Sequence, residues 1–200
     1  MMDKIFPKIH SEGYKFIAIS VFVTLILLLF SKLLGFIGLL ITIWVYYFFR
    51  DPERISIDDQ NYLVSPADGL ITQIAETIGP IEFGLENKKF TRVSIFMNAF
   101  NCHVNRTPCS GLIEDIFYVP GQFLNASLDK ASENNERNLI KIKSKSGDEI
   151  LIVQIAGLIA RRIVCDSNKS QEIRQGERIG MIRFGSRVDI YFNNYKILVK

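Results

Sequence analysis

Gly185 and Ser186 form the only Gly-Ser pair in the chain, and they join two apolar runs at residues 181–184 and 188–192. Because glycine has no side chain, it permits a tight turn and leaves its carbonyl open to a nucleophile. A serine hydroxyl beside that carbonyl could attack it if a base removed the hydroxyl proton. The same pair is far more often an ordinary hairpin turn or bulge, so the dipeptide alone does not establish any chemistry.

His103 and Asp68 are two further residues whose types suit acid–base chemistry. A histidine titrates near neutral pH and is the usual proton carrier of enzymes, although many histidines are only hydrogen-bonded parts of a fold. Cys102 precedes His103, but neighbours on a strand point to opposite faces, so the two are not expected to form a dyad. Asp68 precedes Gly69, and an Asp-Gly pair is common in turns that have no catalytic role.

The composition excludes several other classes of site. The net charge is only +3 and no basic stripe with interleaved aromatic residues is present, so no nucleic-acid partner is expected. Three cysteines without a CxxC spacing do not indicate a disulfide framework, and two distant histidines do not indicate a metal site. Arg161 and Arg162 could bind a phosphate or a carboxylate, but a solvated pair of arginines is an equal alternative.

A hydrophobic segment at residues 16–49 separates a basic N-terminal flank at 1–15 from ordinary sequence that begins at residue 50. As one straight helix this segment would be roughly 50 Å long, against a hydrocarbon core of about 30 Å. Ser31 and Lys32 divide it into two arms, and basic residues flank both outer ends. The pattern predicts a helical hairpin that anchors the chain in a membrane, with both ends on the cytoplasmic side. A cleaved signal peptide is the alternative, but the segment is too long and no small-residue cleavage site follows it.

Residues 50–200 are predicted to form one mainly β (α+β) domain that is a small barrel or sandwich. Short runs rich in β-branched and aromatic residues alternate there with turn signals built from Gly, Pro, Asp and Ser. The predicted strands include residues 92–97, 112–119, 150–155, 178–184 and 187–192. Residues 123–135 are the best helix candidate in this domain.

Several long blocks of the sequence resemble the short bacterial form of phosphatidylserine decarboxylase. The resemblance runs over residues 16–192 and includes YFFRDPER, SPADG, FMNAFNCHVNRTPCSG, VPGQFLNASLDKASENNERN, VQIAGLIARRIVC and GERIGMIRFGSRVDIYF. Blocks of this length are far more specific than any short motif, so the resemblance carries expectations about the fold and the function.

The resemblance implies a proenzyme that cuts itself between Gly185 and Ser186. The Ser186 hydroxyl attacks the Gly185 carbonyl, the chain breaks, and Ser186 becomes a pyruvoyl group, so the cofactor is self-derived and needs neither a metal nor pyridoxal phosphate. The pyruvoyl ketone forms a Schiff base with phosphatidylserine, and decarboxylation gives phosphatidylethanolamine for phospholipid biosynthesis. His103 is implied to transfer protons, and Asp68 to orient or support a base.

The same resemblance implies partners and a location. The substrate is a membrane phospholipid, and the cleaved large and small chains are expected to stay together as a heterodimer, with a homo-oligomer also compatible. The expected location is the cytoplasmic face of a bacterial cell membrane, where an anchor would hold the site beside the lipid head groups.

Two other functions are compatible with the same residues. Asp68, His103 and Ser186 follow the chain order of a known serine-hydrolase triad, although no G-x-S-x-G elbow surrounds Ser186. An inactive decarboxylase is the second alternative, because the sequence departs from the family after residue 192, where closing strands are expected. Longer relatives also carry two histidines around the position of His103, so the resemblance does not imply an Asp-His-Ser relay here.

Overall fold

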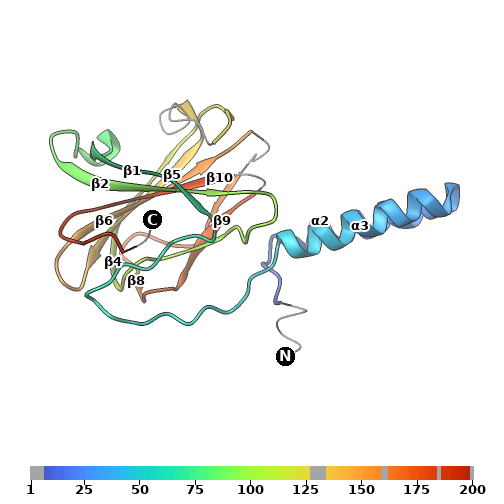
Figure 1. The fold of residues 1–200 in the computed structure, drawn as a ribbon, viewed down its shortest axis with the longest axis horizontal. Helices are drawn as coiled ribbons and strands as arrows, with labels where there is room; N and C mark the ends of the chain where they lie inside the picture. The colour runs from blue at the N-terminus through green and yellow to red at the C-terminus, as the bar shows by residue number, and fades with distance from the viewer. Residues whose placement is uncertain (1–6, 127–133, 159–161, 184–185, 199–200) are drawn as a thin grey trace.

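The computed structural model describes residues 7–126, 134–158, 162–183 and 186–198, and it shows a mainly β domain with a helical hairpin on one side (Figure 1). The fold class expected from the sequence, a sandwich-like β domain preceded by a hydrophobic hairpin, is confirmed. The hairpin projects away from the β domain, so its contacts with that domain are confined to its base.

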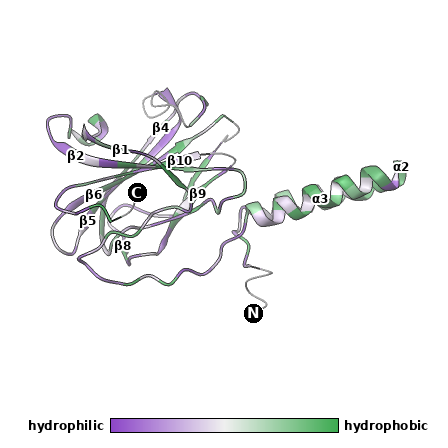
Figure 2. Cartoon of the chain, in the orientation of Figure 1, coloured by the Kyte–Doolittle hydropathy of each residue, from purple (hydrophilic) through white to green (hydrophobic). Residues whose placement is uncertain are grey.

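The hairpin consists of α2 (Gly13–Phe30) and α3 (Lys32–Phe48), which lie antiparallel. Ser31 ends α2, and its hydroxyl accepts a hydrogen bond from the Leu33 amide at the start of α3. Between the helices the Thr24 and Thr42 hydroxyls lie 3.0 Å apart. Most of the remaining side chains are large, apolar and exposed, and both helices are largely green in Figure 2. Among the described helices only α2 is both long and apolar enough to cross a membrane, and α3 is a slightly shorter apolar helix.

In the described part of the chain, ten strands form two antiparallel sheets. The large sheet has seven strands in the order β1 (Leu70–Ile78), β2 (Lys89–Met97), β10 (Ser186–Phe192), β6 (Glu149–Ala156), β5 (Arg137–Ser144), β4 (Gly111–Val119) and β8 (Glu172–Ile173). The small sheet has three strands in the order β3 (Val104–Arg106), β9 (Arg178–Ile182) and β7 (Ile163–Cys165). A 3₁₀ turn, η1 (Ile81–Phe83), lies between β1 and β2.

β10, the last of the described strands, is an interior strand of the large sheet and is third in its order. β10 pairs with β2 on one side and with β6 on the other. Its side chains alternate between faces. Val188, Ile190 and Phe192 join the main core, whereas Tyr191 joins a second apolar cluster. The face that carries Val188 therefore also carries Ser186, two residues earlier.

The predicted strands at 92–97, 112–119, 150–155 and 187–192 correspond to β2, β4, β6 and β10. β9 ends at Ile182, two residues before the predicted end, and Phe184 lies outside the described residues. The helix expected at 123–135 falls largely on residues 127–133, which lie outside the described residues; of the described remainder, residues 123–126 are not helical, whereas Asn134 is.

Candidate active site

Ser186 is the first residue of β10 and is completely buried. Its cross-strand neighbours are Met97 at the end of β2 and Ala156 at the end of β6, both part of the main core. The Ser186 hydroxyl has no hydrogen-bond partner among the described residues. A buried hydroxyl without a hydrogen-bond partner costs about 1–3 kcal/mol, so the unpaired Ser186 hydroxyl lowers the stability of the folded protein.

His103 lies directly before β3 and is also completely buried. Its Nδ1 lies 3.0 Å from the Asn101 carbonyl oxygen. Since a carbonyl can only accept, the Nδ1 atom carries the hydrogen, and in the neutral ring Nε2 is then a bare acceptor. The Nε2 atom has no partner in the described part of the chain.

Burial keeps this imidazole neutral. Desolvation lowers the pKa of His103 from 6.5 to about 4, with a smaller opposing effect from the Asn101 hydrogen bond and a further lowering by the Arg50 charge. At neutral pH the side chain is therefore a base with a free nitrogen, not an imidazolium.

The strand register brings Ser186, His103 and Asp68 to one end of the large sheet. Leu70 pairs with Phe96 and Phe96 pairs with Arg187, so the starts of β1 and β10 lie about 10 Å apart, which is two strand spacings. The amide of Ile182 donates to the His103 carbonyl across 3.3 Å. Ile182 precedes Ser186 by four residues, a length of chain that spans at most about 14 Å.

Asp68 nevertheless has a different partner. Its carboxylate pairs with Arg54, and its side chain is 41% exposed. It borders a cavity of about 130 Å³ whose wall includes Cys102 and Val104, the residues on either side of His103. No hydrogen bond or ion pair joins it to His103 or Ser186 within the described ranges. Because the Asn101 carbonyl occupies the Nδ1 position that a triad aspartate would need, the serine-hydrolase arrangement is not assembled.

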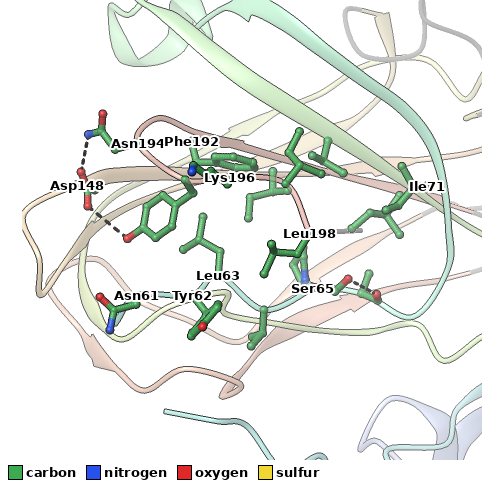
Figure 3. A pocket seen from close by; sticks show the side chains of 18 of the residues that line it. Asn61, Tyr62, Leu63, Ser65, Ile71, Asp148, Phe192, Asn194, Lys196 and Leu198 are labelled. Atoms are coloured by element: carbon green, nitrogen blue, oxygen red, sulfur yellow. Dashed lines mark hydrogen bonds between the residues drawn. The ribbon is translucent and has the colours of Figure 1, made fainter. Parts of the chain in front are cut away.

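Asp68 also borders a larger cavity, of about 1040 Å³, which opens between the large sheet and the C-terminal tail at residues 194–198. Figure 3 shows that apolar side chains line most of it, among them Leu63, Phe192 and Leu198. Asp148 holds the tail in place, since its carboxylate accepts hydrogen bonds from the side chains of Asn194 and Tyr195. Neither Ser186 nor His103 lines this cavity, so the two free atoms are not open to it in this structure.

The end of α3 covers His103. The ring centroids of Phe48 and His103 lie 4.2 Å apart with their planes 31° apart. Phe48 belongs to an apolar cluster that joins the hairpin to β3 and β9, together with Val45, Phe49, Cys102, Val104 and Met181. The thiol of Cys102 donates to the Arg50 carbonyl, and burial raises its pKa, so this cysteine remains a neutral thiol.

A buried chain of three amides lies beside Ser186, and reasoning from the sequence missed it. Asn105 donates to the Met97 sulfur across 3.6 Å, and Gln154 donates to Asn105 across 2.8 Å. Asn138 then donates to Gln154 across 2.9 Å. The available signals were the position of Asn105 two residues after His103, and Gln154 as the only polar residue in the apolar run 150–156.

Three further residues were singled out in the sequence, namely Gly185, Arg161 and Arg162. Gly185 and Arg161 are outside the described residues, whereas Arg162 is exposed. Arg183, two residues before Gly185, pairs with Glu12 at the start of α2 and lies over the Phe16 ring. Within the described ranges no group of three His, Cys, Asp or Glu side chains could hold a metal ion.

Comparisons with known proteins agree on one family. The family model described as phosphatidylserine decarboxylase matches residues 41–200. A phosphatidylserine decarboxylase proenzyme of Pelagibacter ubique is 68% identical over 200 residues, which are 100% of this chain and 93% of that protein. The proenzyme of Ruegeria pomeroyi is 51% identical over 191 residues, 96% of this chain and 87% of that protein. The proenzyme of Rickettsia prowazekii is 52% identical over 189 residues, 94% of this chain and 82% of that protein.

Proposed function

We propose that this chain, which belongs to the phosphatidylserine decarboxylase family, makes its own pyruvoyl group by cutting itself between Gly185 and Ser186. The function of the chain is that of a carboxy-lyase that converts phosphatidylserine to phosphatidylethanolamine. The single observation that carries the self-cleavage proposal is the pair of free atoms, the Ser186 hydroxyl and His103 Nε2, both buried at one end of the sheet.

In the proposed maturation His103 acts first as a base. Its Nε2 takes the Ser186 hydroxyl proton, and the serine oxygen attacks the carbonyl carbon of Gly185. The peptide C–N bond breaks as the new C–O bond forms, and His103 gives the proton to the departing Ser186 nitrogen, so an ester and a free amine replace the amide. Removal of the Ser186 α-proton then expels the carboxylate of Gly185. Water hydrolyses the new N-terminus and releases ammonia, which leaves the pyruvoyl group at position 186.

The residues at this position fit a pyruvoyl group. The Ser186 side chain lies on the inner face of β10, between Met97 and Ala156, and its oxygen is not bonded to any described residue. When present, the group supplies the electron sink for loss of carbon dioxide. His103 is the proposed proton carrier of that reaction as well. Its free Nε2 can accept a proton from a reacting group and return it.

The two chains are proposed to stay together after cleavage. β10 belongs to the small chain that starts at residue 186, and it pairs along its length with β2 and along most of it with β6. Val188, Ile190 and Phe192 remain part of the main core. The broken peptide precedes the strand, so cleavage removes none of these contacts.

The hairpin is proposed to anchor the chain on the cytoplasmic side of a bacterial cell membrane. Its exposed side chains are apolar, and α2 is long enough to cross a hydrocarbon core. His103 lies beneath the last turn of α3, so the proposed membrane surface and the proposed catalytic residue are adjacent. This placement brings the site to the lipid head groups.

The direct test of this function is the conversion of phosphatidylserine in vesicles by purified protein. Wild-type protein is expected to form phosphatidylethanolamine, and Ser186→Ala protein is expected to remain one chain and to form none. A cleaved and active Ser186→Ala protein would overturn the role of Ser186.

A further inference from the structure

The loop at residues 98–101, between β2 and His103, presents an apolar side chain at the base of the hairpin. Phe100 is 75% exposed, and Asn98 and Ala99 beside it are exposed as well. A single exposed phenylalanine needs no explanation by itself. Its position does, because the loop is attached to the part of the anchor that leaves the β domain.

Two hydrogen bonds fix the loop to the end of the hairpin. The indole nitrogen of Trp44 donates to the Ala99 carbonyl across 3.2 Å. Arg50 donates to the Phe100 carbonyl across 2.8 Å. Trp44 lies one turn before the end of α3, where a hairpin of this length would leave the hydrocarbon core. The loop is therefore held at the level of the membrane surface that the hairpin defines.

Hydrogen bonds within the loop hold its shape and leave the Phe100 ring exposed. The Asn98 side chain accepts from the Phe100 amide across 2.8 Å, and the Asn101 side chain accepts from the Asn98 amide across 2.8 Å. These bonds fix the turn without using the Phe100 ring. Because the loop is already held in one shape, insertion of the Phe100 ring into a lipid surface would cost little further conformational entropy.

The charge beside the loop suits an anionic lipid surface. Arg50 bonds the carbonyls of Tyr47 and Phe100, and no carboxylate pairs with it in the part of the chain that the structure describes. A cation at this level attracts the anionic head groups of a cytoplasmic leaflet. An aromatic ring beside Trp44 is typical of a residue at the boundary between head groups and acyl chains.

We propose that the 98–101 loop is a second membrane contact, in which Phe100 enters the lipid interface beside Trp44. This inference rests on the proposed placement of the hairpin in a membrane. It goes beyond that placement, because the anchor is then not the only part of the chain that touches lipid. The loop leads directly to His103, so the lipid contact and the proposed proton carrier lie on one short segment.

The test is depth-dependent quenching of tryptophan emission in vesicles. The chain has a single tryptophan, Trp44, which reports on the hairpin in the wild-type protein. The double variant Trp44→Phe/Phe100→Trp moves the only tryptophan to the loop. The matched control is Trp44→Phe/Ile78→Trp. Ile78 is 59% exposed and is the last residue of β1, whereas the candidate site lies near the first residue of that strand. All three full-length proteins are reconstituted with phosphatidylcholine and phosphatidylglycerol that carry bromine high or deep in the acyl chain.

The expected result is loss of emission from the tryptophan at position 100 with the shallow bromine, a smaller loss with the deep bromine, and no loss from the tryptophan at position 78. If the loop tryptophan is quenched no more than the control, in vesicles that quench wild-type Trp44, the loop contact is overturned and the hairpin placement stands. Absence of quenching for wild-type Trp44 overturns the hairpin placement and the loop contact with it.

A second variant keeps the bond that holds the loop to α3. Phe100→Trp with Trp44 retained preserves the hydrogen bond from Trp44 to the Ala99 carbonyl, which the double variant removes. Its additional emission, relative to the wild-type protein, must show the same preference for the shallow bromine. Additional emission that neither bromine quenches would overturn the loop contact with the loop still attached.

Discussion

The ring of Phe48, the last residue of α3, lies on the ring of His103, with the two centroids 4.2 Å apart. The hydrophobic hairpin, which we propose to be a membrane anchor, therefore also contacts the candidate site directly. Its last turn forms part of the wall around the residue proposed to move protons. Because desolvation is the largest cause of the lowered His103 pKa, the hairpin contributes to the protonation state of the site.

Replacing Phe48 with alanine is expected to change the pH dependence of self-cleavage. Removal of the ring admits water to His103 and raises its pKa from about 4 toward the ordinary 6.5. Since the base must be neutral, the acidic limb of the cleavage rate moves to higher pH. The measurement is the rate of chain cleavage against pH, in protein produced uncut and then allowed to mature.

Phe90→Ala is the matched control for that experiment. Phe90 is as buried as Phe48, but it belongs to the second apolar cluster, on the face of the large sheet opposite to the main core. Both substitutions are expected to lower the free energy of unfolding by about 3–5 kcal/mol. Only Phe48→Ala is expected to move the acidic limb, and an equal shift for Phe90→Ala would show that general loosening is the cause.

The stability of the folded protein is expected to fall in acid because of His103. The unfolded chain takes up this proton near pH 6.5, whereas the folded chain takes it up only near pH 4. Between these values the unfolded state binds more protons, so the free energy of unfolding decreases as the pH falls, and His103 adds no pH dependence above that window. Denaturant unfolding of Ser186→Ala and Ser186→Ala/His103→Gln, both of which are expected to remain one chain, isolates the effect over pH 4–7. Parallel curves for the two proteins would contradict the buried neutral state.

The amide chain from Asn105 to Asn138 is expected to hold the inner wall of the site. Gln154→Ala removes its centre and leaves Asn105 and Asn138 each without one partner. A loss of about 2–4 kcal/mol in the free energy of unfolding is expected, because buried polar groups then lack hydrogen bonds. Cleavage should also slow, since Asn105 contacts Met97, the cross-strand neighbour of Ser186.

The control for the amide chain is Gln73→Ala, at a half-buried site on the edge strand β1, where Gln73 bonds Arg92. It is expected to cost less than about 1 kcal/mol and to leave the cleavage rate unchanged. Loss of stability in Gln154→Ala with an unchanged cleavage rate would restrict the amide chain to a structural role.

Asp68→Asn is expected to slow self-cleavage less than His103→Gln does. Asp68 shares the end of the sheet with Ser186 but is paired with Arg54 and partly exposed. Loss of a positioned base typically costs about 10²- to 10⁴-fold, which is the effect expected for His103→Gln. Time courses of chain cleavage at one pH compare the two variants. An equal defect in both would mean that Asp68 leaves Arg54 and joins the reacting groups during maturation.

Much of the fold could be predicted from local sequence. The hairpin followed from its length, its composition and the Ser31-Lys32 interruption, and four of the predicted strands correspond closely to β2, β4, β6 and β10. β1 was missed because polar residues such as Gln73 and Glu76 interrupt its apolar residues, so this edge strand forms no apolar run. β5 was missed for a similar reason, since lysines alternate with its buried isoleucines.

The site could be predicted only in part. Ser186 and His103 were identified by residue type and by resemblance, but their burial and their two free atoms depend on strand pairings. The contact between Phe48 and His103 joins residues far apart in the sequence, and no spacing rule predicts it. Asp68 was predicted to orient or support a base, whereas its carboxylate pairs with Arg54, which lies in the segment that follows the hairpin.

The intact mass of the purified protein under denaturing conditions tests the central claim most directly. Maturation predicts a large fragment of about 21 kDa that ends at Gly185, and a small fragment of about 1.9 kDa that is lighter than its serine form by the mass of ammonia, about 17 Da. Finding both fragments with that mass difference would agree with conversion of Ser186 to a pyruvoyl group. A single uncut species near 22.9 kDa, or a small fragment that still begins with serine, would contradict it.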